Sequence, residues 1–462
     1  MNDTLKRDGL TVTIIETPTL GDRSYVVDDG HHALVVDPQR DIDRVLAVLE
    51  GRGLRLAAVA ETHAHNDYVS GGLELARRSG AAYLVPCETQ VLYERTEVCD
   101  EDVRTVGTMT VRTIGTPGHT HHHVAFAVGT GDAPAFVFTG GSMLFGAVGR
   151  TDLVAPDATL GLTRAQHASV RRLARELPAD TAVLPTHGFG SFCSATPTSG
   201  TASTIEQQRL QNPALTQDED DFVATLIAGF DAYPPYYAHM GPTNLAGPAP
   251  VDLSPVAEAD ATEVRRRIDA REWVVDLRDR TAFARGHVPG TFSFDATGNL
   301  VTYLGWLIPW GTPLTLIGTS PEQVTEVQRE LVRIGIDRPA AQTTTPVERL
   351  LDGHRLASYR TATFADLAQA RRDGTVHVLD VRRDAEWQKS HLDDAQHIPL
   401  HTLPGRIHDV PDGPVWVHCA GGFRASIAAS LLDAAGKDVI AVDDDFDHAR
   451  DAGLPLSEPV PS

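Results

Sequence analysis

The chain has 462 residues, of which 42% are hydrophobic and 6% aromatic, and its formal net charge at pH 7 is −22. At ~100–200 residues per domain this length predicts two to four domains of ordinary globular composition. The acidic excess disfavours a phosphate backbone as partner, and no apolar run reaches the ~18–20 residues of a membrane span. The first residues lack the apolar core of a signal peptide. We therefore expect a cytoplasmic protein that binds neither nucleic acid nor membrane.

Residues 1–245 alternate short β-branched runs with stretches of helical spacing, which is typical of an α/β domain. Thr163 stands where a helix N-cap is expected. The expected strands cover residues 10–15, 33–37, 57–61, 124–128 and 136–138, the last two as a hairpin, and the expected helices cover residues 41–50, 88–97 and 163–176.

Histidines recur in loops that follow the expected strands of this region. His63 and His65, with Asp67 two residues later, follow the strand at 57–61, and His119 and His187 each lie beside proline or glycine. A single histidine is more often structural. Separate loops of the same form favour a metal centre, because imidazoles brought together at strand ends can converge on one ion.

The pattern resembles the metallo-β-lactamase superfamily, whose hallmark is His-x-His-x-Asp-His followed by later His, Asp and His. The runs Thr116-Pro117-Gly118-His119-Thr120 and Gly149-Arg150-Thr151-Asp152 are similar to its persulfide dioxygenase branch. The resemblance implies an αββα sandwich over residues 1–245.

Two positions depart from that family pattern. Tyr68 stands where the motif ends in histidine, and Gly141 stands where an acidic ligand follows Thr-Gly. In the persulfide dioxygenases iron is held by two histidines, which match His63 and His119, and by that carboxylate. Losing one of three ligands weakens a divalent site. The remaining candidate ligands are His63, His65 and His119, a three-histidine face that suits Fe(II) or Zn(II); the alternative is a metal-free domain.

Other polar residues of the region have less defined roles. Asp67 and His187 are candidates for orienting ligands or handling protons, and Tyr68 is either a pocket residue or a packing aromatic. Cys193 lies just past His187 and is either an acceptor of persulfide or an incidental thiol. Cys87 and Cys99 flank the expected helix at 88–97, and we assign both to structure. No Cys-x-x-Cys pair exists, which excludes a zinc ribbon.

After a Pro/Gly-rich stretch at 241–250, which predicts a linker, a pattern recurs at an offset near 100 residues. Asp276-Leu277-Arg278 with Gly286-His287 returns as Asp380-Val381-Arg382 with Ser390-His391. Another strand before a loop follows in each copy, at 314–317 and at 415–418. Because solenoid repeats are only ~20–50 residues long, the offset indicates a duplicated domain.

Cys419 lies between the apolar strand at 415–418 and a helix expected to begin near Arg424. The intervening loop, Ala420-Gly421-Gly422-Phe423, has the glycines needed to curl so that its amides point inward. Such amides and the helix N-terminus lower a thiol pKa and stabilise the nucleophilic thiolate. Arg424 is then placed to help hold an anionic donor such as thiosulfate. The alternative is a buried, inert cysteine.

The Cys-x-x-Gly-x-Arg run, with Asp380 and His391 upstream, resembles the rhodanese family of sulfurtransferases, in which a parallel sheet is flanked by helices. The resemblance implies that Cys419 carries sulfane sulfur as a persulfide. The first copy has Gly318 at the position of the cysteine. We therefore expect an inactive rhodanese-like domain over 258–352 and an active one over 360–460.

The sequence thus predicts a role in sulfane-sulfur metabolism, as a sulfurtransferase fused to a persulfide dioxygenase-like domain whose iron site is altered or lost. One alternative is an active persulfide dioxygenase–sulfurtransferase that converts low-molecular-weight persulfides to sulfite and thiosulfate. Another is a non-enzymatic sulfur carrier or sensor. The expected partners are small persulfides, thiosulfate or sulfite, and the resemblance also implies a homo-oligomer.

Overall fold

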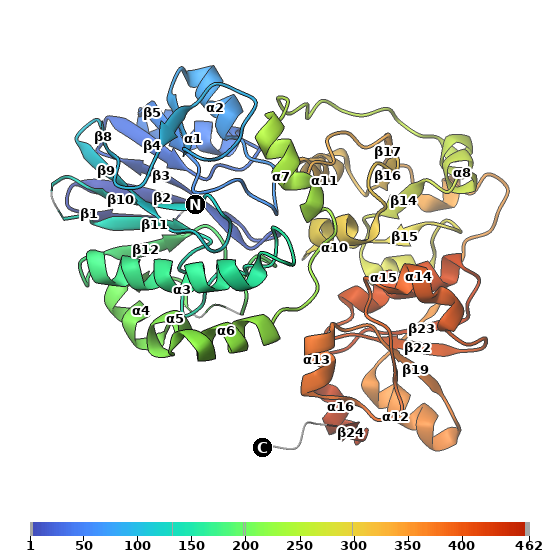
Figure 1. Ribbon diagram of the computed structural model, residues 1–462. Coiled ribbons are helices and arrows are strands. Elements are labelled where there is room, and N and C mark those ends of the chain that lie inside the picture. Colours follow the sequence, from blue (N-terminus) through green and yellow to red (C-terminus); the bar gives the residue numbers. More distant parts are fainter. Residues whose placement is uncertain (1–2, 132, 197, 199, 298, 458–462) are drawn as a thin grey trace. The chain divides into compact units, whose positions relative to one another are not determined.

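The computed structural model describes residues 3–131, 133–196, 198, 200–297 and 299–457. The chain divides into two compact units, whose helices and strands are labelled in Figure 1. The first unit contains Met1–Asp252 with Glu330–Ile336, and the second contains Leu253–Arg329 with Asp337–Ser462. None of the described helices combines the length and the apolar character that crossing a membrane requires.

Strands β1 to β7 form one sheet of the first unit, and neighbours along the chain are neighbours in the sheet. The pairs from β1 to β4 are antiparallel, whereas those from β4 to β7 are parallel. The predicted strands at 10–15, 33–37 and 57–61 correspond to β2, β4 and β5. The bounds are β1 Thr4–Arg7, β2 Leu10–Thr17, β3 Asp22–Asp28, β4 His32–Val36, β5 Arg55–Ala60, β6 Ala82–Pro86 and β7 Thr96–Val98.

A second sheet has the order β13-β12-β11-β10-β9-β8. The predicted hairpin is its antiparallel pair β10 and β11, in which Phe126 lies opposite Phe138. β12 runs parallel to β11, so both strands end at the same edge of the sheet. The bounds are β8 Val103–Val106, β9 Met109–Gly115, β10 Val124–Gly129, β11 Phe136–Gly140, β12 Ala182–Pro185 and β13 Ser203–Thr204.

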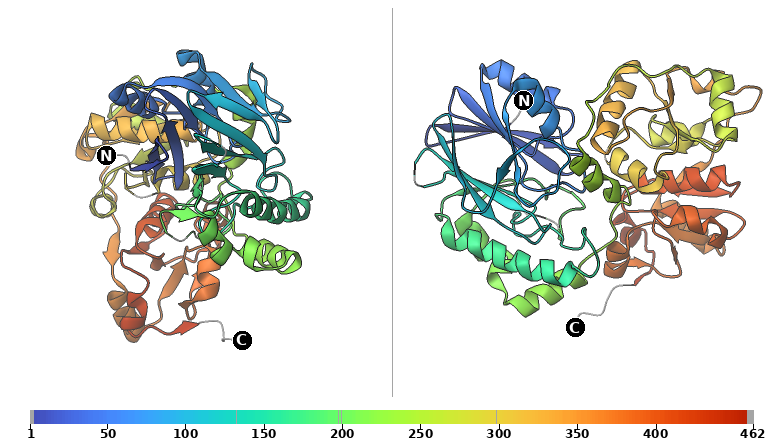
Figure 2. Two further views of the ribbon diagram at one scale, coloured as in Figure 1. Left: turned by 90° about the vertical axis from the view of Figure 1, so that its left-hand side faces the viewer. Right: turned by 45° about the horizontal axis from the view of Figure 1, so that its top comes forward.

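Alternating apolar side chains bury both faces of each sheet, because successive side chains of a strand point to opposite sides. Val27 belongs to the cluster that also contains Phe126 and Phe138 of the second sheet, whereas its neighbour Val26 packs with residues of α1 and α2. Helices α3 to α6 cover the outer face of the second sheet (Figures 1 and 2). The helices are α1 Asp43–Arg52, α2 Gly72–Ser79, α3 Thr159–Glu176, α4 Ile205–Gln211, α5 Pro213–Thr216, α6 Glu219–Ala228 and α7 Tyr237–Ala246.

Two of the predicted helix features are wrong. The predicted helix at 41–50 is correct and corresponds to α1. The predicted N-cap at Thr163 is wrong, because α3 begins earlier, at Thr159. The hydroxyl of Thr163 donates to the Thr159 carbonyl at 2.8 Å inside the helix. The segment 88–97 forms no helix; it turns and enters β7, where the Cys87 amide donates to the Val98 carbonyl at 3.0 Å. Pairing with the edge of a sheet here outweighs local helix propensity.

The predicted linker at 241–250 is also wrong over its first half, since residues 241–246 belong to α7. Burial explains the difference: Tyr237, Met240 and Asn244 of this helix are buried. The Asn244 side chain donates to the carbonyls of His65 and Tyr68 at 2.8 and 2.9 Å. These contacts outweigh the cost of a proline inside a helix.

The second unit contains two sheets built from parallel pairs among its described strands. One has the order β15-β14-β16-β17 and the other the order β18-β23-β22-β19-β21. The strands are β14 Trp273–Asp276, β15 Phe292–Ser293, β16 Leu314–Ile317, β17 Ala341–Thr343, β18 Arg360–Ala362, β19 His377–Asp380, β20 His391–Leu392, β21 Gln396–His397, β22 Val415–His418, β23 Val439–Val442 and β24 Leu456–Ser457. The α-helices are α8 Ala261–Asp269, α9 Arg280–Arg285, α10 Leu300–Leu307, α11 Pro321–Arg333, α12 Phe364–Asp373, α13 Asp384–Lys389, α14 Leu403–Arg406, α15 Phe423–Ala434 and α16 His448–Asp451.

The sequence repeat corresponds to repeated contacts in these two sheets. Arg278 donates to Asp276 at 2.7 Å and Arg382 donates to Asp380 at 2.6 Å, and each arginine also donates to a carbonyl eight residues ahead at 2.8 Å. The bidentate pair at the end of β14 or β19 thus fixes the loop that follows. The boundaries 258–352 and 360–460 stay predictions.

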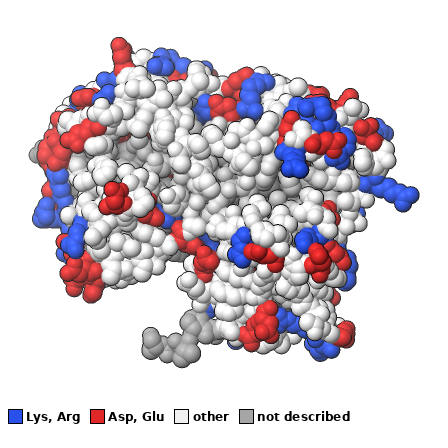
Figure 3. All heavy atoms as spheres, turned by 45° about the vertical axis from the view of Figure 1, so that its right-hand side comes forward, with Lys and Arg blue, Asp and Glu red and all other residues white. Residues whose placement is uncertain are grey.

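The surface carries charges of both signs on the face that Figure 3 shows, where acidic and basic side chains are interspersed. Some charged side chains form ion pairs at short range, such as Arg266 with Glu263 at 2.7 Å. Exposed pairs of this kind contribute little stability, typically ~0–1 kcal/mol.

Candidate functional site

Cys419 lies directly after β22, the middle strand of its sheet, and before α15. Its side chain is 2% exposed, and its sulfur accepts the amide hydrogen of Ala425 at 3.4 Å. Gly422 has φ +87°, and a side chain there would collide with Asp443. The predicted tight curvature of the loop therefore has a direct cause, and an amide of the first turn of α15 points at the thiol.

Arg424 is bound by an acidic residue that the sequence did not single out. Its guanidinium donates to both carboxylate oxygens of Glu386, at 2.5 and 2.7 Å. Burial raises the pKa of Glu386, but Arg424 outweighs this effect and holds that pKa at about 2. The sequence predicts that Arg424 holds an anionic donor, and the Glu386 carboxylate already orients its guanidinium.

An aromatic residue of α10 is a further neighbour of the Cys419 loop. The Tyr303 ring meets that of Phe423 edge-on, at 5.9 Å between centroids. Burial raises the pKa of Tyr303, and its electrostatic neighbours include Arg424 and Cys419. Tyr303 belongs to the copy without a cysteine, so sequence spacing gave no signal that it lies beside Cys419.

In the first unit, His63, His119 and His187 come together at one edge of the two sheets. They follow β5, β9 and β12 respectively. All three are buried, and their ligand nitrogens lie within 4.8 Å of one another. The predicted set of His63, His65 and His119 is not among the groups of described residues that meet this distance.

Hydrogen bonds to groups other than His63 and His187 hold the His119 ring in place. Its Nδ1 donates to the carbonyl of Arg150 at 2.7 Å, and its backbone amide donates to Gln166 at 2.9 Å. Among the described residues, its buried Nε2 has no hydrogen-bond partner. Burial, with repulsion from His187, lowers the pKa of His119 to about 3, so the ring is neutral.

His187 lies between two carboxylates. Its Nδ1 is 2.9 Å from Asp22 Oδ1 and 3.2 Å from Asp67 Oδ2. Burial lowers the pKa of His187, but Asp67 and Asp22 outweigh burial and raise it well above its usual range. Burial and the neighbouring Asp67 raise the pKa of Asp22 to about 8. From sequence, Asp67 has two candidate roles, orienting a ligand or handling protons, and its contact with His187 Nδ1 corresponds to the first.

His65 faces a different set of groups. Its Nε2 lies 3.2 Å from Asp37, 3.3 Å from Glu61 and 3.0 Å from the Tyr68 hydroxyl. Burial lowers the pKa of His65, but Asp37 and Glu61 outweigh it and raise that pKa to about 9. Tyr68 also stacks on the ring at 4.3 Å, so it is both a packing aromatic and a hydrogen-bond partner.

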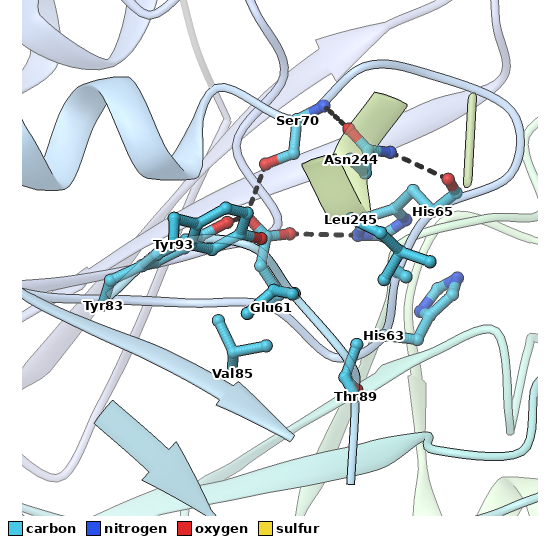
Figure 4. A pocket seen from close by; sticks show the side chains of 12 residues that line it. Glu61, His63, His65, Ser70, Tyr83, Val85, Thr89, Tyr93, Asn244 and Leu245 are labelled. Atoms are coloured by element: carbon cyan, nitrogen blue, oxygen red, sulfur yellow. Dashed lines mark hydrogen bonds and ion pairs between the residues drawn. The ribbon is translucent and has the colours of Figure 1, made fainter. Parts of the chain in front are cut away.

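A small pocket opens beside His65, and Figure 4 shows the side chains that line it. Glu61 accepts hydrogen bonds there from Tyr83 at 3.0 Å and from Ser70 at 2.5 Å. The Ser70 amide in turn donates to Asn244 of α7 at 2.8 Å. The pocket wall is therefore a connected polar network.

Gly141, the second departure from the family motif, lies against two histidine rings. Its amide donates to His123 Nε2 at 3.0 Å. A Cβ at position 141 would lie 2.7 Å from His119 Nε2 and closer to the ring carbons. His123 is buried whereas His121 and His122 are exposed, a difference that three successive histidines do not reveal in sequence.

The remaining cysteines differ in their surroundings. Cys193 is buried, and burial together with Asp67 raises the pKa of its thiol well above the usual range. A hydrogen bond between Cys99 and Cys87 raises the pKa of Cys99 to about 11, so these two thiols are in contact. None of these thiols has the amide environment of Cys419 within the described structure.

Comparisons with known proteins agree with this geometry. Residues 20–187 match the family model of the Metallo-beta-lactamase superfamily, and residues 363–450 match that of the Rhodanese-like domain. The chain is 27% identical over 239 residues to "Persulfide dioxygenase ETHE1, mitochondrial" of Homo sapiens, covering 52% of this chain and 80% of that protein. It is 32% identical over 183 residues to a hydroxyacylglutathione hydrolase of Chromohalobacter salexigens, covering 38% of this chain and 67% of that protein.

Among solved structures, a metallo-beta-lactamase from Staphylococcus aureus subsp. aureus COL aligns with a TM-score of 0.65 and 24% identity, over 72% of this chain and 99% of that one. At this identity the likeness shows the fold alone. The predicted metallo-β-lactamase fold at the N-terminal end and rhodanese-like fold at the C-terminal end are confirmed.

The Arg424–Glu386 pair makes the stability of the second unit depend on pH. E386Q leaves a buried guanidinium without its anion, and we expect it to lower the free energy of unfolding by about 1–3 kcal/mol at pH 7. The folded-state pKa of Glu386 is about 2, below an unfolded value of ~4.3. Its contribution is therefore complete above ~pH 5 and is lost as pH falls toward 2. Urea denaturation should show the wild-type and E386Q stabilities converging over this range; a constant difference would contradict the assignment.

Proposed function

Because the chain belongs to the metallo-β-lactamase superfamily, through a domain homologous to the persulfide dioxygenase ETHE1, and carries a rhodanese-like domain at its C-terminal end, we propose that it is a cytoplasmic sulfurtransferase of sulfane-sulfur metabolism. Cys419 is its nucleophile. Small persulfides, thiosulfate and sulfite are its substrates and products.

The observation that carries this proposal is the amide of Ala425 directed at the Cys419 sulfur at 3.4 Å, at the N-terminus of α15. A helix N-terminus and an N–H donor both favour an anion on that sulfur. The Cys419 thiolate attacks the outer sulfur of thiosulfate, the S–S bond breaks, and sulfite leaves with the bonding electron pair. An acceptor such as cyanide then removes the outer sulfur of the persulfide and regenerates the thiolate.

Groups around the loop support selection of an anionic donor. Arg424 keeps its charge at any accessible pH, and Glu386 fixes its orientation. Tyr303 adds a hydroxyl that can donate a hydrogen bond to a bound oxyanion. In this proposal residues 258–352, which have Gly318 where a nucleophile would stand, act as scaffold and supply Tyr303.

A second candidate function is persulfide oxidation in the first unit, and the cluster of His63, His119 and His187 favours it. Bound iron would supply the redox chemistry toward O₂. The overall reaction adds O₂ and water to a persulfide RSSH and gives RSH and sulfurous acid, so the outer sulfur loses the four electrons that O₂ gains. An altered iron site that has lost this activity is the competing proposal, and zinc is the alternative ion.

C419S should abolish thiosulfate:cyanide sulfur transfer, because a hydroxyl cannot form the persulfide. C193S serves as the matched control, since it removes a thiol outside the α15 environment, and it should retain transfer. The measurement is thiocyanate formation, with mass spectrometry for the added 32 Da on Cys419. Retained turnover in C419S would exclude the nucleophile, whereas stoichiometric persulfidation without turnover in the wild type would indicate a sulfur carrier.

Y303F removes a hydroxyl beside Cys419 and Arg424 while keeping the ring. If the hydroxyl donates to the bound thiosulfate, the KM for thiosulfate should rise by more than about 10-fold, consistent with ~1.5–3 kcal/mol for a hydrogen bond to a charged group, and kcat should change less. Y233F, in the first unit, is the control. An unchanged KM in Y303F would assign Tyr303 to packing alone.

Oxygen consumption tests the second candidate function. Protein from iron-supplemented culture, given glutathione persulfide, should consume one O₂ for each sulfite released. H119A should lose this activity, and H121A, which changes an exposed histidine, should keep it. Iron-loaded wild-type protein that consumes no O₂ would leave sulfur transfer at Cys419 as the function of the chain.

A further inference from the structure

We infer that the first unit binds one transition-metal ion through the Nε2 atoms of His63, His119 and His187, so that His187 takes the part of the carboxylate that Gly141 lacks. This ligand set differs from the two histidines and one carboxylate of the persulfide dioxygenases. It also differs from the sequence prediction, which had His65 as the third ligand. The inference deepens the second candidate function, but it concerns metal binding alone and is tested by reading the metal.

Hydrogen bonds at Nδ1 of His63 and His119 fix the orientation of these two rings and turn Nε2 of each away from that partner. The Thr62 hydroxyl donates to Asp37 at 2.7 Å, so it accepts from His63 Nδ1 at 2.9 Å. His119 Nδ1 donates to the Arg150 carbonyl at 2.7 Å. An imidazole that donates from one nitrogen presents a lone pair on the other, which is how outer partners prepare histidine ligands.

His187 completes the set from the same side. Its Nδ1 is 2.9 Å from Asp22 Oδ1, and its Nε2 lies 3.4 Å from His63 Nε2. Two nitrogens bound at ~2.0–2.1 Å to a tetrahedral zinc ion lie about 3.4 Å apart. The His63–His187 spacing is therefore already that of two ligands on one ion.

An unsatisfied atom supports the same position for the ion. His119 Nε2 is buried and has no hydrogen-bond partner in the described structure, although a buried polar atom normally has one. A ring nitrogen of His119 lies within 4.8 Å of the ligand nitrogens of His63 and His187. A metal ion supplies the missing partner without any rearrangement of the Arg150 contact.

A carboxylate at position 141 does not fit this arrangement. Any Cβ there would lie 2.7 Å from His119 Nε2 and closer still to other ring atoms. The Gly141 amide is also committed to His123 Nε2 at 3.0 Å. The loss of the acidic residue and the position of the His119 ring thus belong together, and glycine is required by this form of the site.

Two other groups of potential ligands are less suited. Asp37 and Glu61 already accept hydrogen bonds from other groups, Asp37 from the Thr62 amide at 2.7 Å and Glu61 from Tyr83 at 3.0 Å, although Glu61 Oε2 and His65 Nδ1 have no hydrogen-bond partner in the described structure. In the group of His65, Asp67 and His187, Asp67 contacts His187 through Nδ1, at 3.2 Å. Asp67 therefore orients the ring from the side opposite Nε2.

Neutral ligands leave the full charge of a divalent ion in the site. Three imidazoles suit Zn(II) or Fe(II) and keep open positions for a further ligand. Because no protein carboxylate reduces the charge of the ion directly, an anionic ligand such as a thiolate or persulfide is favoured over a neutral one.

The test is metal binding by the full-length chain. Apo-protein titrated with Co(II) or Zn(II) should bind one ion per chain, and Co(II) should give the visible absorption of a tetrahedral or five-coordinate nitrogen site. H187Q should weaken Zn(II) binding by at least about 100-fold, more than the ~10–100-fold typical of losing an outer partner. H121Q, the matched exposed histidine, should bind as the wild type does. Unchanged affinity in H187Q would overturn the inference.

G141D discriminates the two ligand sets. In the three-histidine site it should weaken Zn(II) binding, because the new side chain displaces the His119 ring; tighter binding would show that a carboxylate fits beside His119 and would contradict its exclusion from this site. X-ray absorption of the zinc-loaded wild type covers the case in which a variant fails to fold. Three imidazoles are expected, and two imidazoles, or no bound zinc, would overturn the inference while leaving sulfur transfer at Cys419 untouched.

Discussion

Burial of polar rings is the constraint on which the first unit depends. A polar group removed from water without a hydrogen bond costs several kcal/mol in an apolar medium, so each buried imidazole at the edge of the two sheets needs a partner. Hydroxyl, carbonyl and carboxylate groups of the surrounding loops provide those partners at Nδ1 of His63, His119 and His187. These hydrogen bonds orient the rings, and ligand nitrogens of the three histidines lie within 4.8 Å of one another.

The need of buried polar groups for partners also determines the surroundings of the Cys419 thiol in the second unit. Cys419 is nearly inaccessible, and its sulfur has an amide partner at the start of α15. Arg424 is buried beside it and is neutralised by Glu386. Removing either member of such a buried ion pair leaves an uncompensated charge. The ion pair therefore connects the Cys419 loop to α13, which contains Glu386. In both units a chemically reactive atom lies at a strand end and is oriented by a partner that does not react.

The sequence predicted those features that depend on local pattern. Short β-branched runs predicted β2, β4 and β5, and the Gly421-Gly422 pair predicted a curled loop after Cys419 and a helix start near Arg424, where α15 begins at Phe423. Features that depend on tertiary contacts were not predicted. Gly241 and Pro242 suggested a linker, but burial of Met240 and Asn244 makes a helix there.

Local sequence could not rank the candidate metal ligands for the same reason. Spacing alone treats His63 and His65 as equivalent, yet successive side chains leaving a strand end point in different directions, and His65 meets Asp37 and Glu61. His187 comes from the other sheet, so its approach to His63 has no signal in either local sequence. Tyr303 is a similar case, since its relation to Cys419 exists only through the packing of two chain segments far apart in sequence.

The two candidate centres are chemically separable because their supporting contacts lie in different units. Every group that orients the histidines belongs to residues 22–187, and every group described around Cys419 belongs to residues 303–443. A change such as Gly141 can therefore alter the first centre without changing the contacts described around Cys419 in the second. Loss of the acidic residue at position 141 would leave the proposed sulfur transfer unaffected, since that reaction would use Cys419, the loop between β22 and α15 and the ion pair that supports it.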